Sequence, residues 1–142
     1  MILFFDTSAL IKRYISERGS DKVDDLFNMA TQIFVSAITK TESFSTLRRL
    51  RSENNLSRKE YNAIKTNIEV DFQYFVVIPF IYEIESSAIK LIEQNQLKSL
   101  DSIQLSTAIY CKSIIDNLVA EDTRLLKSAK AEKLKTINPT EN

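Results

Sequence analysis

Hydrophobic residues in this chain form short runs, separated by longer stretches in which they recur every three or four positions. Short apolar runs are typical of buried strands, whereas the wider spacing is typical of helices with one buried face. The runs predict strands at Ile2–Phe5, Ile33–Val35, Phe75–Ile78, Leu118–Val119 and Leu134–Ile137.

Helical spacing fills the intervals between these strands. It predicts helices at Asp21–Met29, after Thr39 to about Arg51, after Ser57 to about Phe72, and at Tyr82–Glu93, Ser99–Lys112 and Asp122–Ala131. Because the strand runs are continuously apolar, we expect strands that are covered on both faces. The pattern therefore predicts an α/β protein with a central parallel sheet of four to five strands, flanked by helices.

Two of the predicted helices begin with a hydroxyl residue followed three positions later by glutamate, the pattern of a capping box. These are Thr39 with Glu42 and Ser57 with Glu60. The helix that contains Glu60 follows another helix, so we expect Glu60 to act only as a cap. Ser20 is predicted to precede the helix that starts at Asp21.

Four acidic residues occupy positions near the ends of strands or the starts of helices. Asp6 follows the first strand, Glu42 the second and Asp122 the fourth, while Asp101 opens a helix. Each has a purely structural alternative. Asp6 and Asp122 suit N-caps, Glu42 suits the capping partner of Thr39, and Asp101 suits a first-turn acid stabilised by the helix dipole.

Their joint placement favours a shared site, because helices that follow parallel strands begin at the carboxyl edge of the sheet, where ligand sites form. Carboxylates brought together there repel one another unless a cation offsets their charge. Carboxylate oxygens suit Mg²⁺ or Mn²⁺. Such ions orient phosphodiesters and activate water, so the four acids indicate a metal-dependent nuclease.

Composition narrows the chemistry further. The chain of 142 residues has the length of one domain and contains no histidine, which excludes imidazole catalysis. Its single cysteine, Cys111, disfavours a zinc site and suits a reducing compartment, so we expect a cytoplasmic protein. No apolar run approaches the length of a membrane span.

Charge gives no overall indication of a polyanion partner, since 19 basic residues balance 19 acidic ones. Contacts with nucleic acid must therefore be local. The best candidates for phosphate contacts are Lys12, Arg13 and Lys40, which follow the predicted catalytic strand ends.

The sequence resembles PIN-domain ribonucleases, and in particular the VapC toxins of type II toxin–antitoxin (VapBC) systems. The segments that carry the resemblance are Phe5–Leu10, Thr41–Phe44, Leu100–Ala108 and Val119–Leu125. It implies one PIN domain over residues 1–142 and a three-layer PIN-like fold. It also implies an endoribonuclease whose Mg²⁺ or Mn²⁺ is held by the acids at 6, 42, 101 and 122. Glu121, next to Asp122, is an alternative fourth ligand, although register with the family favours Asp122. The implied partners are substrate RNA, a VapB-type antitoxin and a second copy in a homodimer, with no membrane.

One position departs from the family pattern. The family often has Thr or Ser two residues before the fourth acid, where this chain has Ala120. The hydrogen bond that such a hydroxyl would supply could come instead from Thr7, Ser8, Ser102 or Thr123.

Two other functions compete with the nuclease. A phosphoacceptor domain of receiver type needs an aspartate at the end of its third strand, where this chain has Val76–Pro79 and no acid. A non-catalytic PIN-like module that binds RNA or protein would not need the four acids, all of which are present.

Overall fold

The computed structural model describes residues 1–53 and 56–141. Its elements, in chain order, are β1 (Ile2–Phe5), α1 (Thr7–Leu10), the 3₁₀ helix η1 (Ile11–Arg13), α2 (Ser20–Met29), β2 (Gln32–Ser36), α3 (Thr39–Glu53), α4 (Arg58–Phe72), β3 (Val76–Ile78), α5 (Tyr82–Asn95), α6 (Ser99–Tyr110), β4 (Asn117–Val119), α7 (Thr123–Ala131) and β5 (Thr136–Ile137).

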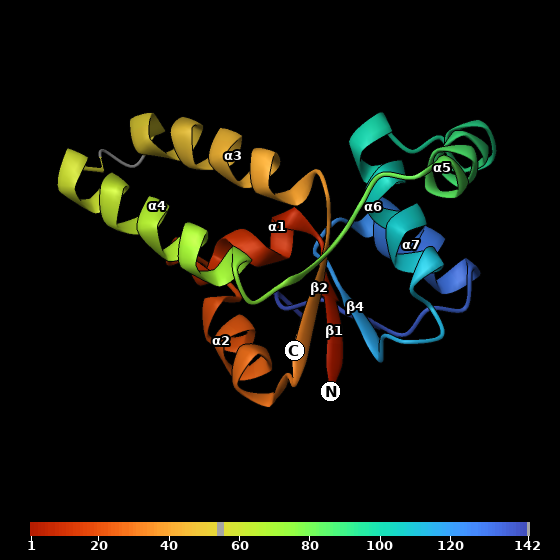
Figure 1. Ribbon diagram of the computed structural model, residues 1–142, viewed down its shortest axis with the longest axis horizontal. Helices are drawn as coiled ribbons and strands as arrows, with labels where there is room; N and C mark the ends of the chain where they lie inside the picture. The colour runs from red at the N-terminus through yellow and green to blue at the C-terminus, as the bar shows by residue number, and fades with distance from the viewer. Residues whose placement is uncertain (54–55, 142) are drawn as a thin grey trace.

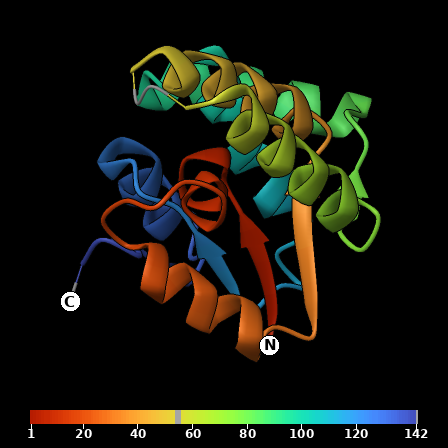
Figure 2. The same cartoon turned by 90° about the vertical axis from the view of Figure 1, so that its left-hand side faces the viewer.

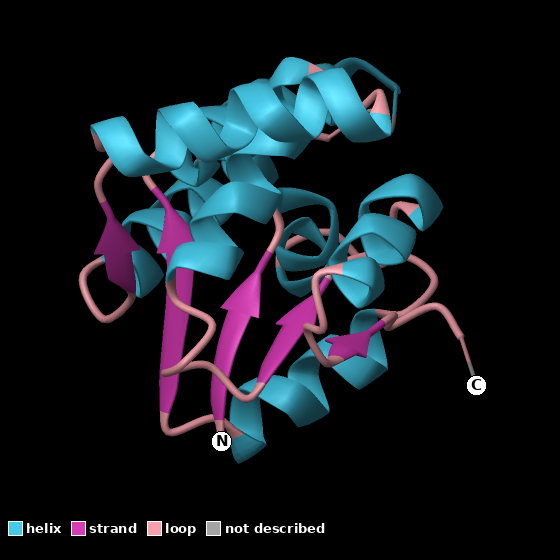
Figure 3. Cartoon of the chain, turned by 90° about the vertical axis from the view of Figure 1, so that its right-hand side faces the viewer, coloured by secondary structure: helices cyan, strands magenta, loops and turns pink. Residues whose placement is uncertain are grey.

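The strands form one parallel sheet in the order β3-β2-β1-β4-β5 (Figures 1 and 3). β1 lies at the centre, where Leu3 pairs with Ile33 of β2 and Phe4 pairs with Leu118 of β4. Since all strands run in the same direction, their carboxyl ends share one edge of the sheet. The predicted parallel sheet is confirmed.

Side-chain alternation along the strands gives the sheet two apolar faces. Leu3 and Phe5 of β1 pack in one cluster with Val23 of α2, whereas Phe4 packs in the other with Leu105 of α6. Figure 1 shows α2 on one side of the sheet and α5, α6 and α7 on the other. The central strands β1, β2 and β4 are thus covered on both faces, which explains their continuous runs of apolar residues, whereas the edge strands β3 and β5 are only partly buried.

The helices α3 and α4 lie side by side over α1, beyond the carboxyl edge of the sheet (Figures 1 and 2). Leu47 of α3 and Ile68 of α4 are fully buried, while most other residues of the two helices remain exposed or partly exposed. None of the helices in the described ranges is long and apolar enough to cross a membrane.

Every predicted strand and helix is present, with ends shifted by one or two residues. The prediction missed α1 and η1, which are too short to show a hydrophobic repeat. It was also wrong about Ser20, which lies inside α2. The N-cap is Gly19, whose φ of 93° is a left-handed conformation that favours glycine.

The two predicted capping boxes have different outcomes. The box at Ser57 is confirmed, because the amide of Glu60 donates to Ser57 Oγ at 3.1 Å and the amide of Ser57 donates to Glu60 Oε1 at 3.3 Å. The box at Thr39 is wrong. α3 already includes Thr39, whose hydroxyl accepts a hydrogen bond from Gln104, and the amide of Glu42 donates to a backbone carbonyl.

Replacing Ser57 by alanine should lower the free energy of unfolding by about 1 kcal/mol, because α4 loses the acceptor for its first-turn amide. Urea denaturation measures this difference. Ser45→Ala is the matched control, since Ser45 is exposed inside α3. Equal stability of the Ser57→Ala variant and the wild type would show that the box contributes nothing.

Candidate active site

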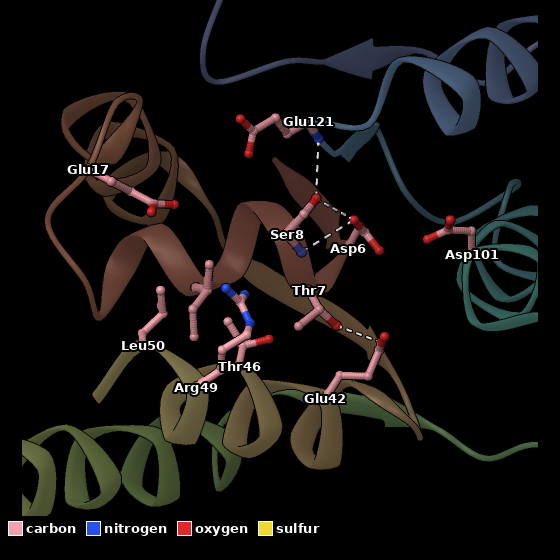
Figure 4. A pocket seen from close by; sticks show the side chains of 11 residues that line it. Asp6, Thr7, Ser8, Glu17, Glu42, Thr46, Arg49, Leu50, Asp101 and Glu121 are labelled. Atoms are coloured by element: carbon pink, nitrogen blue, oxygen red, sulfur yellow. Dashed lines mark hydrogen bonds between the residues drawn. The ribbon is translucent and has the colours of Figure 1, made fainter. Parts of the chain in front are cut away.

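Three of the four predicted acids line one cavity of about 380 Å³ at the carboxyl edge of the sheet. Asp6 directly follows β1, Glu42 lies in the first turn of α3 and Asp101 lies in the first turn of α6. Figure 4 shows the three carboxylates facing a common space. The structure therefore brings together residues that are up to 95 positions apart in the sequence.

Asp6 is 4% exposed and caps α1. Its Oδ2 atom accepts hydrogen bonds from Ser8 Oγ at 2.5 Å and from the amide of Ser8 at 3.3 Å. Burial is the largest cause that raises the pKa of Asp6 to about 6, against the lowering effect of Ser8, and repulsion from Glu42 and Asp101 adds to it. The predicted cap is thus present, but it leaves Oδ1 without a hydrogen bond among the described contacts.

Glu42 is held by neutral donors. Thr7 Oγ1 and Gln104 Nε2 each donate to Glu42 Oε1 at 2.8 Å. Both donors are neutral, so they orient the carboxylate without supplying a positive charge. Within the described contacts, Oε2 of Glu42 accepts no hydrogen bond, so a second oxygen is again available.

Asp101 is partly buried and, in the part of the chain described, its carboxylate accepts no hydrogen bond. Burial raises its pKa, as does repulsion from Asp122 and Glu42, while Lys98 opposes the shift. This repulsion indicates that Asp122 lies near Asp101.

Asp122 does not line the cavity and is exposed at the start of α7. It caps this helix by accepting the amide of Leu125 on Oδ1 at 2.9 Å. Its neighbour Glu121 does line the cavity, but its Oε2 lies 2.9 Å from Lys12 Nζ, which balances its charge. Within the described ranges, Glu121 thus has a cationic partner and Asp122 does not.

Lys12 is a buried cation beside these acids, at 4% exposure. Its Nζ atom lies 3.0 Å from Glu17 Oε1 as well as 2.9 Å from Glu121 Oε2. Burial lowers the pKa of Lys12, but the bonds to Glu121 and Glu17 outweigh it and the net shift is upward. Lys12 therefore joins two loops at the rim of the cavity.

Lys12, Arg13 and Lys40, the predicted phosphate contacts, do not line the cavity, and each has an acidic partner. Arg13 Nε lies 2.7 Å from Asp71 Oδ2, and Lys40 Nζ lies 2.7 Å from Glu69 Oε2. The basic residue that lines the cavity is Arg49.

Two of the four hydroxyl residues considered as substitutes for a hydroxyl at position 120 contact predicted acids. Ala120 is fully buried in the apolar core, whereas Ser8 bonds to Asp6 and Thr7 bonds to Glu42. Ser102 and Thr123 do not take this role, because Ser102 donates to a backbone carbonyl of its own helix and Thr123 is exposed.

The prediction missed Gln104 as a residue of the site. Its amide contacts Glu42, Thr7 and Thr39 although it lies on α6. One signal was present in the sequence, since Gln104 is a long polar residue one turn after Asp101, next to small and apolar residues.

Carboxylate oxygens are the ligands that a hard divalent cation prefers. Here, carboxylate oxygens that accept no hydrogen bond among the described contacts face a shared space. In the described residues, however, no group of three acidic or cysteine side chains converges closely enough to enclose an ion. Gathering the acids around one ion therefore requires side chains such as that of Asp101, which no hydrogen bond restrains, to turn inward.

Known structures share this fold. FitAcB from Neisseria gonorrhoeae has a TM-score of 0.73 at 19% identity, over 98% of each chain. A toxin–antitoxin complex from Klebsiella pneumoniae has a TM-score of 0.68 at 19% identity, over 99% of each chain. VapC20 from Mycobacterium tuberculosis, a sarcin-ricin loop cleaving toxin, has a TM-score of 0.66 at 16% identity, over 89% of this chain and 94% of that chain.

A family model agrees with the fold. No curated protein matches the chain in sequence. Residues 3–131 match the model of the PIN domain, which includes the strands β1 to β4 and all four acids. The chain therefore belongs to the PIN domain family.

Proposed function

We propose that this protein is a metal-dependent endoribonuclease that hydrolyses RNA phosphodiester bonds, and that it is the VapC-type toxin of a toxin–antitoxin pair. The observation that carries the proposal is the cavity shared by Asp6, Glu42 and Asp101, with Asp122 beside it. Membership of the PIN family supports it, as does the likeness to VapC20, a toxin that cleaves the sarcin-ricin loop.

Asp6, Glu42, Asp101 and Asp122 would hold Mg²⁺ or Mn²⁺, each through an oxygen that its present hydrogen bonds leave unused. A divalent ion at this position supplies positive charge that orients a phosphodiester and neutralises charge on its oxygens. Ser8 and Thr7 fix the orientation of two of the acids.

The proposal extends to partners. The similar structures include toxin–antitoxin complexes, which supports a VapB-type antitoxin as the inhibitor of this chain. We further propose one PIN domain over residues 1–142, a homodimer, and action on RNA in the cytoplasm.

RNA cleavage by the purified protein tests the proposal. The wild type should cut RNA in Mn²⁺ or Mg²⁺ but not in EDTA, and Asp101→Asn should remove the activity. Glu60→Gln is the matched control, because Glu60 is an exposed acid outside the cavity and glutamine preserves its capping box. RNA binding that ignores EDTA, without cleavage, would instead identify a non-catalytic binding module.

Arg49 should contact a phosphate of the bound RNA. It lines the cavity, and within the described chain its ion pair is with Glu53 at 3.2 Å, between two exposed side chains. Such a pair is weak enough to exchange for a phosphate.

Replacing Arg49 by alanine should weaken binding of single-stranded RNA and reduce the slope of log K against log salt by about 0.7, the contribution of one phosphate contact. Fluorescence anisotropy in EDTA measures binding without cleavage. Arg48→Ala is the control, since Arg48 is exposed on the same helix but does not line the cavity. An equal effect of both variants would assign Arg49 to nonspecific attraction.

A further inference from the structure

Gln104 links three parts of the candidate site from a buried position. It is 1% exposed on α6, and its Nε2 atom lies 3.0 Å from Thr7 Oγ1, 3.0 Å from Thr39 Oγ1 and 2.8 Å from Glu42 Oε1. The same helix carries Asp101 one turn earlier. One side chain therefore connects the helix of one acid to the helix of another.

The other end of this amide is unsatisfied. Gln104 Oε1 is buried and has no hydrogen-bond partner in the described structure. A buried carbonyl without a partner is unfavourable, and most buried polar atoms avoid this state. Turning the amide by 180° would not help, because it would place the carbonyl oxygen against the carboxylate of Glu42.

Glu42 therefore determines the orientation of the Gln104 amide. If Gln104 served only packing, its replacement by an apolar residue of similar volume would cost the protein little stability. A buried polar atom without a hydrogen-bond partner is expected mainly at positions where function requires it.

We propose that Gln104 is a positioning residue that fixes the Glu42 carboxylate for a divalent cation. This inference rests on the proposed function of Glu42 as a ligand. The amide binds Oε1 and leaves Oε2 without a hydrogen-bond partner among the described residues. Because Gln104 is neutral, it restrains Glu42 without supplying a positive charge that would compete with the cation.

Mn²⁺ binding to the purified protein without RNA tests this role, by calorimetric titration. Gln104→Met keeps the approximate volume but removes both N–H donors. We expect Mn²⁺ affinity to fall between about 10-fold and 100-fold, as for other residues that orient a metal ligand. Gln104→Leu replaces this variant if circular dichroism shows that the methionine variant is unfolded.

Two further variants separate positioning from a general structural effect. Ser106→Ala removes another buried hydrogen bond of α6, from Ser106 Oγ to the carbonyl of Ile84, and should leave Mn²⁺ affinity unchanged. In a double-mutant cycle, Gln104→Met should cause little further loss once Glu42→Gln is present.

The outcomes distinguish this inference from the proposed function. If the wild type binds Mn²⁺ and Gln104→Met binds it equally well, the role of Gln104 is wrong and the proposed function stands. Additive losses in the double-mutant cycle would also overturn the inference, because Gln104 would then act independently of Glu42. A wild type that binds no Mn²⁺ would overturn both.

Discussion

Replacing Asp6 by asparagine should reduce the rate of RNA cleavage by more than about 100-fold. Residues that merely orient a metal ligand typically account for roughly 10–100-fold in metal affinity or activity, and the loss of a ligand charge should exceed this range. Asparagine keeps the shape of Asp6 and an oxygen that can accept from Ser8. The variant should therefore remain folded, and single-turnover cleavage of a defined RNA measures the loss.

The control for this variant is again Glu60→Gln, which removes one negative charge at an exposed capping position. It should cleave at the rate of the wild type. An Asp6→Asn protein that retained most of its activity would exclude Asp6 as a metal ligand.

The second large effect is on stability. Asp6 has a pKa of about 6 in the folded protein against 3.8 for an ordinary aspartate, chiefly because it is buried. Between these values the folded state holds a proton that the unfolded state has released, so rising pH favours unfolding. In the metal-free protein, Asp6 alone should lower the free energy of unfolding by about 3 kcal/mol between about pH 3 and pH 7.

Asp6→Asn lacks this titration, so its stability relative to the wild type should increase over the same interval and then level off above about pH 7. Urea denaturation in EDTA at several pH values measures the difference, which cancels the titration of acids that lie away from Asp6. A difference that does not change with pH would contradict the buried, charged state of Asp6.

The strands and their common edge were predictable because a buried strand appears in the sequence as a continuous run of apolar residues. β1 is a run of apolar residues whose alternate side chains enter opposite clusters, and Asp6 follows at its end. The positions of Asp6 and Glu42 at one edge then follow from parallel strands. The position of Asp101 in the first turn of a helix was predictable, since acids favour that turn.

Contacts between distant elements were not predictable. The pattern Thr39-x-x-Glu42 predicts a capping box, but Glu42 has better donors in Thr7 and Gln104, which only the fold brings near. Likewise, Lys12 follows a strand end as a phosphate-binding residue would, yet the fold places it between two acids. In both cases, contacts with residues that are distant in the sequence determine the role of the side chain, and the local sequence does not predict those contacts.

Mapping of the 5′ ends in total RNA tests the central claim most directly. The purified protein, free of any antitoxin, is incubated with RNA in Mn²⁺ or Mg²⁺, in EDTA, and in parallel as the Asp6→Asn variant. We expect discrete new ends that require the metal and disappear with the variant. Identical RNA in all samples, from wild-type protein shown to be folded and to bind Mn²⁺, would contradict the assignment of this site as a ribonuclease.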